Sequence, residues 1–217
     1  MPSIMNKAVV RHRRLLLLTV AVLLPACTLP RIIVLHDPLS SQEHVRLGGI
    51  YAAQGETKLA RDQYQVAVEA DKKNGKAWQL LGDVSAELKE YKEAEKAYDK
   101  ALDLDPKNGD LHNNLAWVYV AQDRKLEKAK DLVEKAMELT PDHRPYYLDT
   151  LGVVQLKIGK PHEAVAALKE AVETLPKDQP AFLSEAWRHL SEAYHAAGEE
   201  AASQQALTRA QELAPKP

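Results

Sequence analysis

Apolar and small residues recur at helical spacing between Gly75 and Asn108. Three residues at positions i, i+3 and i+7 share one face of a first helix: Trp78, Leu81 and Ser85. Small residues allow a second, antiparallel helix to approach closely: Gly82, Ala94 and Ala101. Tyr98 fills the groove between the two helices, and Pro106 stops the second one. The segment predicts a helix-turn-helix pair that cannot bury its apolar face alone.

The same spacing returns along the chain with a period of about 34 residues. Five segments carry it: 41–74, 75–108, 109–144, 145–178 and 184–217. The third has an extra residue in its inter-helix loop around Asp123 to Leu126, which should bulge. A short insert from Gln179 to Leu183, broken at Pro180, separates the last two. Stacking of neighbouring pairs is then needed to cover the apolar faces.

These positions resemble the consensus of the tetratricopeptide repeat (TPR), most clearly through Trp78, Leu81, Gly82, Ala94, Tyr98, Ala101 and Pro106. The resemblance implies an all-α fold, a right-handed α-solenoid of about five helix-turn-helix repeats spanning 41–217. It also implies that the first helices line a concave groove for peptides or protein partners, and it does not imply a catalyst. Ser40-Ser41-Gln42-Glu43 predicts a capping box where the array begins.

Residues 1–26 have the pattern of a signal peptide. Basic residues precede an apolar run from Leu15 to Leu24, which is about half the length that a membrane-spanning helix needs. Leu24-Pro25-Ala26-Cys27 resembles the lipobox of bacterial lipoproteins, which implies cleavage before Cys27 and acylation of its thiol. The alternative is a buried or free cysteine after an ordinary signal peptide. As the chain has one cysteine, it can form no internal disulfide, which favours a modified thiol.

The resemblance to lipoproteins also implies a location in the cell. Lipoproteins with aspartate after the cysteine tend to remain in the inner membrane, whereas Thr28 follows Cys27 here. We therefore expect a lipid-anchored protein of the bacterial cell envelope, on the outer membrane and facing the periplasm. Residues 27–40 would form the lipidated N-terminus and tether. Their apolar stretch either packs on the first repeat or on a partner, or is an irregular tether.

Composition agrees with an ordered helical protein, since 45% of the residues are hydrophobic and 28% are charged. Removal of residues 1–26 takes away four basic residues and no acidic one, so the formal charge falls from −2 to about −6. Charges of both signs are interspersed along the predicted helices. A nucleic-acid partner is therefore not expected, because phosphate binding needs clustered Lys and Arg.

The sequence holds no pattern of a catalytic, metal or cofactor site. Its eight histidines include no HExxH motif and no i, i+4 pair on one helix. His189 and His195 are six residues apart, so they point to different helix faces, and we expect solvated or capping side chains. Neither a Gly-x-Ser-x-Gly elbow nor a glycine-rich phosphate loop is present. We expect no enzyme, no cofactor and no metal.

Function is then expected to lie in the groove. The positions that line it in TPR domains supply the candidate partner-binding residues, which are Gln79, Asp83, Asn113, Trp117, Tyr146, Asp149 and Arg188. Trp117 and Tyr146 lie outside the consensus aromatic positions and are the first candidates for anchoring an extended peptide. Alternatively, both rings only fill contacts between successive repeats.

The expected function is a non-catalytic envelope lipoprotein scaffold. Its groove would bind a protein or peptide partner and so assemble or localise an envelope complex, such as secretion, pilus, polysaccharide-export or wall machinery. The alternative function is an accessory subunit that docks substrate for an envelope enzyme such as a peptidase or a glycan synthase. The final step from groove to pathway rests on analogy within the fold.

Overall fold

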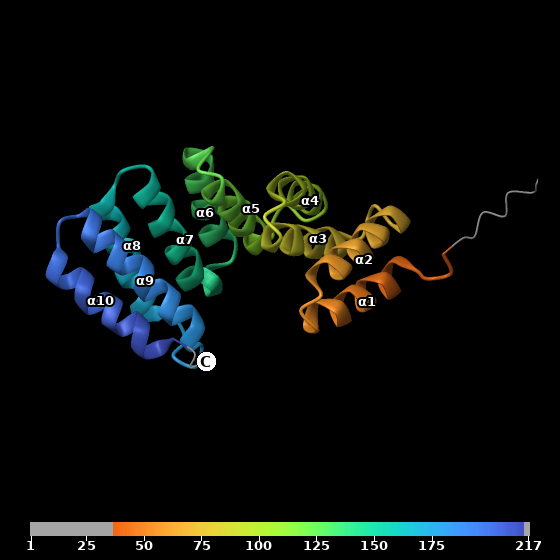
Figure 1. Ribbon diagram of the computed structural model, residues 1–217. Helices are drawn as coiled ribbons and strands as arrows, with labels where there is room; N and C mark the ends of the chain where they lie inside the picture. The colour runs from red at the N-terminus through yellow and green to blue at the C-terminus, as the bar shows by residue number, and fades with distance from the viewer. Residues whose placement is uncertain (1–36, 215–217) are drawn as a thin grey trace, which may run out of the picture. The chain divides into compact units, whose positions relative to one another are not determined.

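The computed structural model describes residues 37–214, within which the chain forms ten α-helices, one short 3-10 helix and no strand (Figure 1). The helices are α1 Ser41–Ala53, α2 Thr57–Ala70, α3 Gly75–Glu87, α4 Tyr91–Leu104, α5 Gly109–Ala121, α6 Leu126–Leu139, η1 Pro141–His143, α7 Arg144–Lys157, α8 Pro161–Thr174, α9 Pro180–Ala196 and α10 Glu200–Leu213. In this part of the chain no helix is both long and apolar enough to cross a membrane. The expected signal peptide 1–26, Cys27 and the apolar stretch of the tether lie outside the described residues.

The helices pack in consecutive pairs, α1 with α2 through α9 with α10. The second helix of each pair contacts the first helix of the next, and the first helices α3, α5, α7 and α9 also contact one another in that order (Figure 1). This arrangement confirms the predicted all-α solenoid of helical repeats.

Close packing within a pair depends on a glycine opposite a large side chain. A Cβ at Gly82 would lie 2.6 Å from Cε1 of Tyr98, and a Cβ at Gly152 would lie 2.3 Å from Cγ of Leu168. Ala94 and Ala101 beside Tyr98 are 0% and 1% exposed. The predicted roles of Gly82, Ala94 and Ala101 in bringing the two helices together are confirmed.

Polar caps fix where several helices begin. Ser40 and Glu43 form the predicted capping box, with the Glu43 carboxylate accepting from the Ser40 backbone N–H at 2.7 Å. Asn74 and Asn108 accept hydrogen bonds from the backbone N–H of Ala77 and Leu111, at 3.0 and 3.2 Å. Each asparagine satisfies a donor that the first turn of a helix leaves without an intrahelical partner.

The loop between α5 and α6 contains the predicted extra residue, since residues 122–125 connect these helices and the other pairs are joined by three residues. Asp123 and Lys125 adopt positive φ angles of 52° and 51°. The neighbouring Glu95 carboxylate binds Arg124 and accepts from Lys125 Nζ at 2.7 Å. The bulged loop is therefore tied back to α4.

The predicted break at Pro180 is wrong, because α9 begins at Pro180 and runs for 17 residues, so that the insert forms an additional helical turn. Proline is well suited to the first turn of a helix, since its fixed φ is helical and its missing N–H would have no partner there. Leu183 is 6% exposed and packs with Leu175, which holds this additional turn against the preceding repeat.

Candidate partner-binding groove

Four of the seven candidate residues meet in one pocket formed by α5, α7 and α9. The pocket has a volume of about 180 Å³ and is lined by Asn113, Trp117, Tyr146, Asp149, Thr150, Leu175, Phe182 and Glu185. We call it the Trp117–Tyr146 pocket. Its position between three successive first helices makes it a recess in the surface predicted to receive a partner.

Aromatic rings form much of its wall. Trp117 and Tyr146 are half-buried, so each ring packs against the repeats and also faces solvent. Phe182 lies edge-on to Tyr146 with the ring centroids 5.4 Å apart, and it remains 58% exposed. The Tyr146 hydroxyl donates to Gln179 Oε1 at 2.9 Å, which fixes the ring beside the start of α9.

The polar groups of this pocket are mainly acceptors. Asn113 is 8% exposed, and its Oδ1 is buried without a hydrogen-bond partner. Asp149 accepts from Nδ1 of His189 at 2.9 and 3.1 Å. Glu185 stands at the rim, where its side chain is 53% exposed. A ligand that donates hydrogen bonds or carries positive charge would complement this set.

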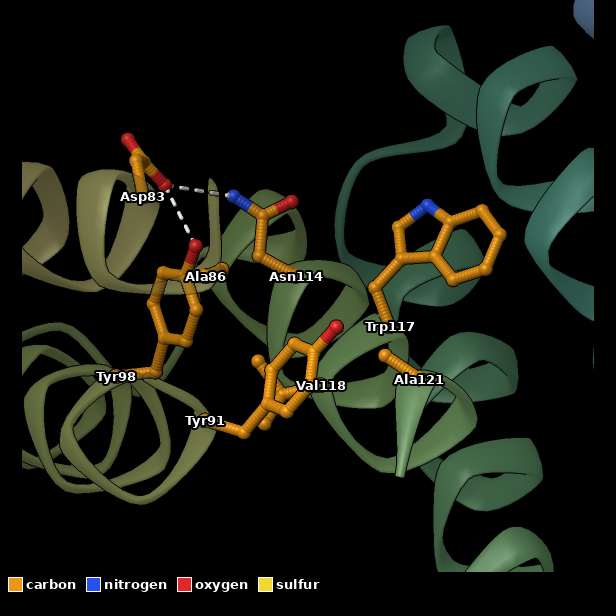
Figure 2. Close-up of a pocket in the computed structure, with 8 residues that line it drawn as sticks. All are labelled: Asp83, Ala86, Tyr91, Tyr98, Asn114, Trp117, Val118 and Ala121. Atoms are coloured by element: carbon orange, nitrogen blue, oxygen red, sulfur yellow. Dashed lines mark hydrogen bonds between the residues drawn. The ribbon is translucent and has the colours of Figure 1, made fainter. Parts of the chain in front are cut away.

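A second pocket lies on the other side of Trp117, between α3, α4 and α5. It has a volume of about 340 Å³ and is lined by Asp83, Ala86, Tyr91, Tyr98, Asn114, Trp117, Val118 and Ala121. We call it the Asp83 pocket. Figure 2 shows Tyr98 and Asn114 pointing at the same Asp83 carboxylate.

Asp83 is bound within the protein from two directions. It accepts from the Tyr98 hydroxyl at 2.7 Å and from the Asn114 amide at 3.2 Å. Burial raises the pKa of the Asp83 carboxyl, and the hydrogen bonds together with the charge of Lys76 offset that rise only in part. The residue therefore links the second repeat to the third as well as facing the groove.

The remaining two candidates line neither pocket. Gln79 accepts from Lys76 Nζ at 3.3 Å and lines a separate hollow with Lys76 and Leu111. Arg188 is exposed on α9, where it forms ion pairs with Glu185 and Glu192. The structure thus does not bring all seven residues together.

His189 contradicts the expectation of a solvated or capping side chain. It is 4% exposed, and its ring lies 6.1 Å from that of Trp117. Burial alone would lower the pKa of His189, but the hydrogen bond to Asp149 and the charges of Asp149 and Glu185 outweigh burial and raise it. The expectation is wrong because it considered only the helix that carries His189. Asp149, the partner of His189, belongs to the preceding repeat.

Phe182 lines the pocket but was not among the candidates. It lies on the additional turn at the start of α9. The signal that could have revealed it is Pro180, because proline is suited to the first turn of a helix.

Residues 37–214 contain no group of three or more His, Cys, Asp or Glu side chains that could hold a metal ion. The carboxylates and histidines near the groove are engaged in pairs such as His189 with Asp149 and His143 with Asp110. What the site offers is therefore a surface of aromatic rings and acceptors.

Comparison with protein families gives a match over residues 64–182, to the family described as the cytochrome c-type biogenesis protein H TPR domain. This stretch is more than half of the 217 residues. The chain belongs to this TPR family. The predicted resemblance to tetratricopeptide proteins is confirmed. A comparison with curated protein sequences gave no match.

Solved structures of other TPR proteins share the fold. TTC0263, a thermophilic TPR protein of Thermus thermophilus, is 23% identical with a TM-score of 0.67, covering 82% of this chain and 93% of its own. PilW, described as a widely conserved type IV pilus biogenesis factor, is 22% identical with a TM-score of 0.70. The match covers 80% of this chain and 77% of PilW. YrrB, described as having an unusual peptide-binding site, is 21% identical with a TM-score of 0.58. The match covers 82% of this chain and 88% of YrrB.

Proposed function

We propose that this TPR protein is a non-catalytic envelope lipoprotein whose groove binds a protein or peptide partner during the assembly of an envelope complex. The observation that carries the proposal is the half-buried Trp117, which stands between two pockets on the surface of the first helices. Half-buried aromatic residues bordering recesses are common anchors of protein interfaces.

Two comparisons support a role in assembly. The matched family carries cytochrome c-type biogenesis in its description, and PilW is described as a pilus biogenesis factor. YrrB, with its peptide-binding site, has the same type of fold and supports the binding of a peptide. The step from these proteins to this chain rests on the shared fold and on the pockets described above.

The proposal includes an anchor at Cys27. The lipobox-like Leu24-Pro25-Ala26-Cys27 and the following Thr28 support acylation and placement on the periplasmic side of the outer membrane. Cys27→Ser should abolish incorporation of labelled palmitate and move the protein from the membrane to the soluble fraction. Palmitate labelling that persists in Cys27→Ser would contradict the proposed lipid anchor. The proposal that the groove binds a partner does not depend on this result.

The groove is tested by affinity capture of the full chain from detergent-solubilised envelopes. We expect a partner captured by the parent protein to be lost from Trp117→Ala, Tyr146→Ala. The matched control is Ile50→Ala, Leu59→Ala, which also removes two exposed apolar side chains, neither of which lines a pocket described above. Helicity and unfolding midpoints establish that both variants fold. Capture that is equal in all three proteins would overturn the groove assignment.

A further inference from the structure

The wall of the Trp117–Tyr146 pocket includes a departure from the repeat. The helix α9 has 17 residues, whereas the other first helices have 13 or 14. Its additional turn places Phe182 against Tyr146, where the phenylalanine is 58% exposed. Core packing does not account for a large apolar side chain left in solvent, so the ring is available to a ligand.

Three aromatic side chains now surround the recess, one from each of three successive first helices. Trp117 comes from α5, Tyr146 from α7 and Phe182 from α9. The face of an aromatic ring carries partial negative charge and attracts a cation placed within about 6 Å. Groups of aromatic rings around one recess are therefore typical of sites for alkylammonium and guanidinium groups.

The charged side chains that line the recess are Asp149 and Glu185, both acidic. The basic side chains paired with them are Arg188 and His189, and Arg188 also pairs with Glu192. Three carboxylates then face one guanidinium, which leaves a net charge of about −2 with His189 neutral and about −1 with His189 protonated. The cluster stays negative in either state.

An unused acceptor lies in the same recess. Asn113 lines it from α5, and the buried Oδ1 of this residue has no hydrogen-bond partner. A buried acceptor without a partner is unfavourable, and an N–H donor of a bound group that reaches it would satisfy it. Aromatic faces, acidic charge and this free oxygen favour the same kind of ligand.

We propose that the Trp117–Tyr146 pocket binds a lysine or arginine side chain of the partner. The proposal rests on the proposed function, in which the groove binds a protein. The alkyl stem packs against the rings of Trp117, Tyr146 and Phe182, and the charged head reaches the carboxylates of Asp149 and Glu185. An acidic segment or a chain-terminal carboxylate would be repelled by the same cluster.

Four synthetic peptides that alternate glycine with lysine, arginine, glutamine or glutamate test the chemistry on the full chain in detergent. The chain has three tryptophans, so nitrogen-labelled indole groups give three N–H signals, and Trp117→Phe identifies one of them. The lysine and arginine peptides should shift the Trp117 signal, and added salt should weaken the effect. Equal shifts with the glutamine or glutamate peptide would overturn the proposal.

Exposed residues allow a variant that keeps the fold. Phe182→Ala, Glu185→Gln should weaken the lysine and arginine peptides by about 3- to 30-fold, because it removes one ring and one carboxylate. The matched control Leu59→Ala, Glu173→Gln removes an exposed apolar group and an exposed carboxylate elsewhere and should bind as the parent does. Unchanged affinity in the first variant would refute the cation site. If capture of a partner still requires Trp117, the cation site is refuted but the proposed function is not.

Discussion

Removal of one hydroxyl group, in Tyr98→Phe, tests how the two helices of the second repeat, α3 and α4, are held together. Tyr98 is 2% exposed, and its hydroxyl donates to Asp83 at 2.7 Å. The substitution keeps the ring that fills the space beside Gly82, so it removes a hydrogen bond without opening a cavity. With Asp83 ionised, the lost bond is charge-assisted and stabilises the fold by about 1.5–3 kcal/mol. For a protein of this size that corresponds to a decrease of about 3–12 °C in Tm.

The pH dependence of the loss has a definite sign. The hydrogen bond from Tyr98 acts to lower the pKa of Asp83, so Tyr98→Phe raises that pKa further. The decrease in unfolding free energy caused by Tyr98→Phe is then largest where Asp83 is ionised. It becomes smaller as the pH falls and the carboxyl is protonated. Urea unfolding of parent and variant at neutral and acidic pH measures the difference.

A matched control and a second background make this prediction refutable. Tyr64 fills the equivalent place beside Gly48, and no hydrogen bond of its hydroxyl to the described residues is seen. Tyr64→Phe should therefore change the unfolding free energy by less than about 0.5 kcal/mol. In an Asp83→Asn background the effect of Tyr98→Phe should fall to about 1 kcal/mol, because the bond is then between neutral groups. Equal losses for Tyr64→Phe and Tyr98→Phe would refute the reasoning.

Two further predictions concern His189 and Lys89. The pKa of His189 is raised in the folded protein, so its stabilising contribution is complete below about pH 6.5 and is lost as the pH rises through the higher folded value. Urea midpoints between about pH 6 and pH 8 should decline less in His189→Gln than in the parent, and parallel curves would contradict this. Lys89 has φ 61°, where Gly55, Gly159 and Gly198 stand in other loops. Lys89→Gly should therefore raise the unfolding free energy by about 0.5–1 kcal/mol, whereas unchanged thermal unfolding would oppose the idea.

The repeat spacing predicted most of the fold because each repeat is held by contacts between residues close in sequence. Gly82 and Tyr98 lie in one repeat, and their spacing alone indicates that they face each other. The capping box at Ser40 and the extra loop residue near Asp123 are equally local. Local patterns of this kind are readable without knowing how the repeats stack.

The candidate site was less predictable because its contacts cross from one repeat to the next. His189 meets Asp149, 40 residues earlier, and no single repeat contains both. Phe182 reaches Tyr146 only because α9 starts at Pro180, which sequence spacing alone suggested to be a break. The consensus positions predicted that Trp117 and Tyr146 face the groove. They did not predict which polar side chains lie beside these two rings.

The indole of Trp117 is a wall shared by two recesses, the Asp83 pocket and the Trp117–Tyr146 pocket. A ligand that fixes the indole from one side changes the surface offered on the other side. Thermodynamic linkage makes such an effect reciprocal, so the two recesses would bind cooperatively or antagonistically by the same factor in both directions. Partner segments would then be distinguished by the pair of side chains they place on either side of Trp117, rather than by either side chain alone.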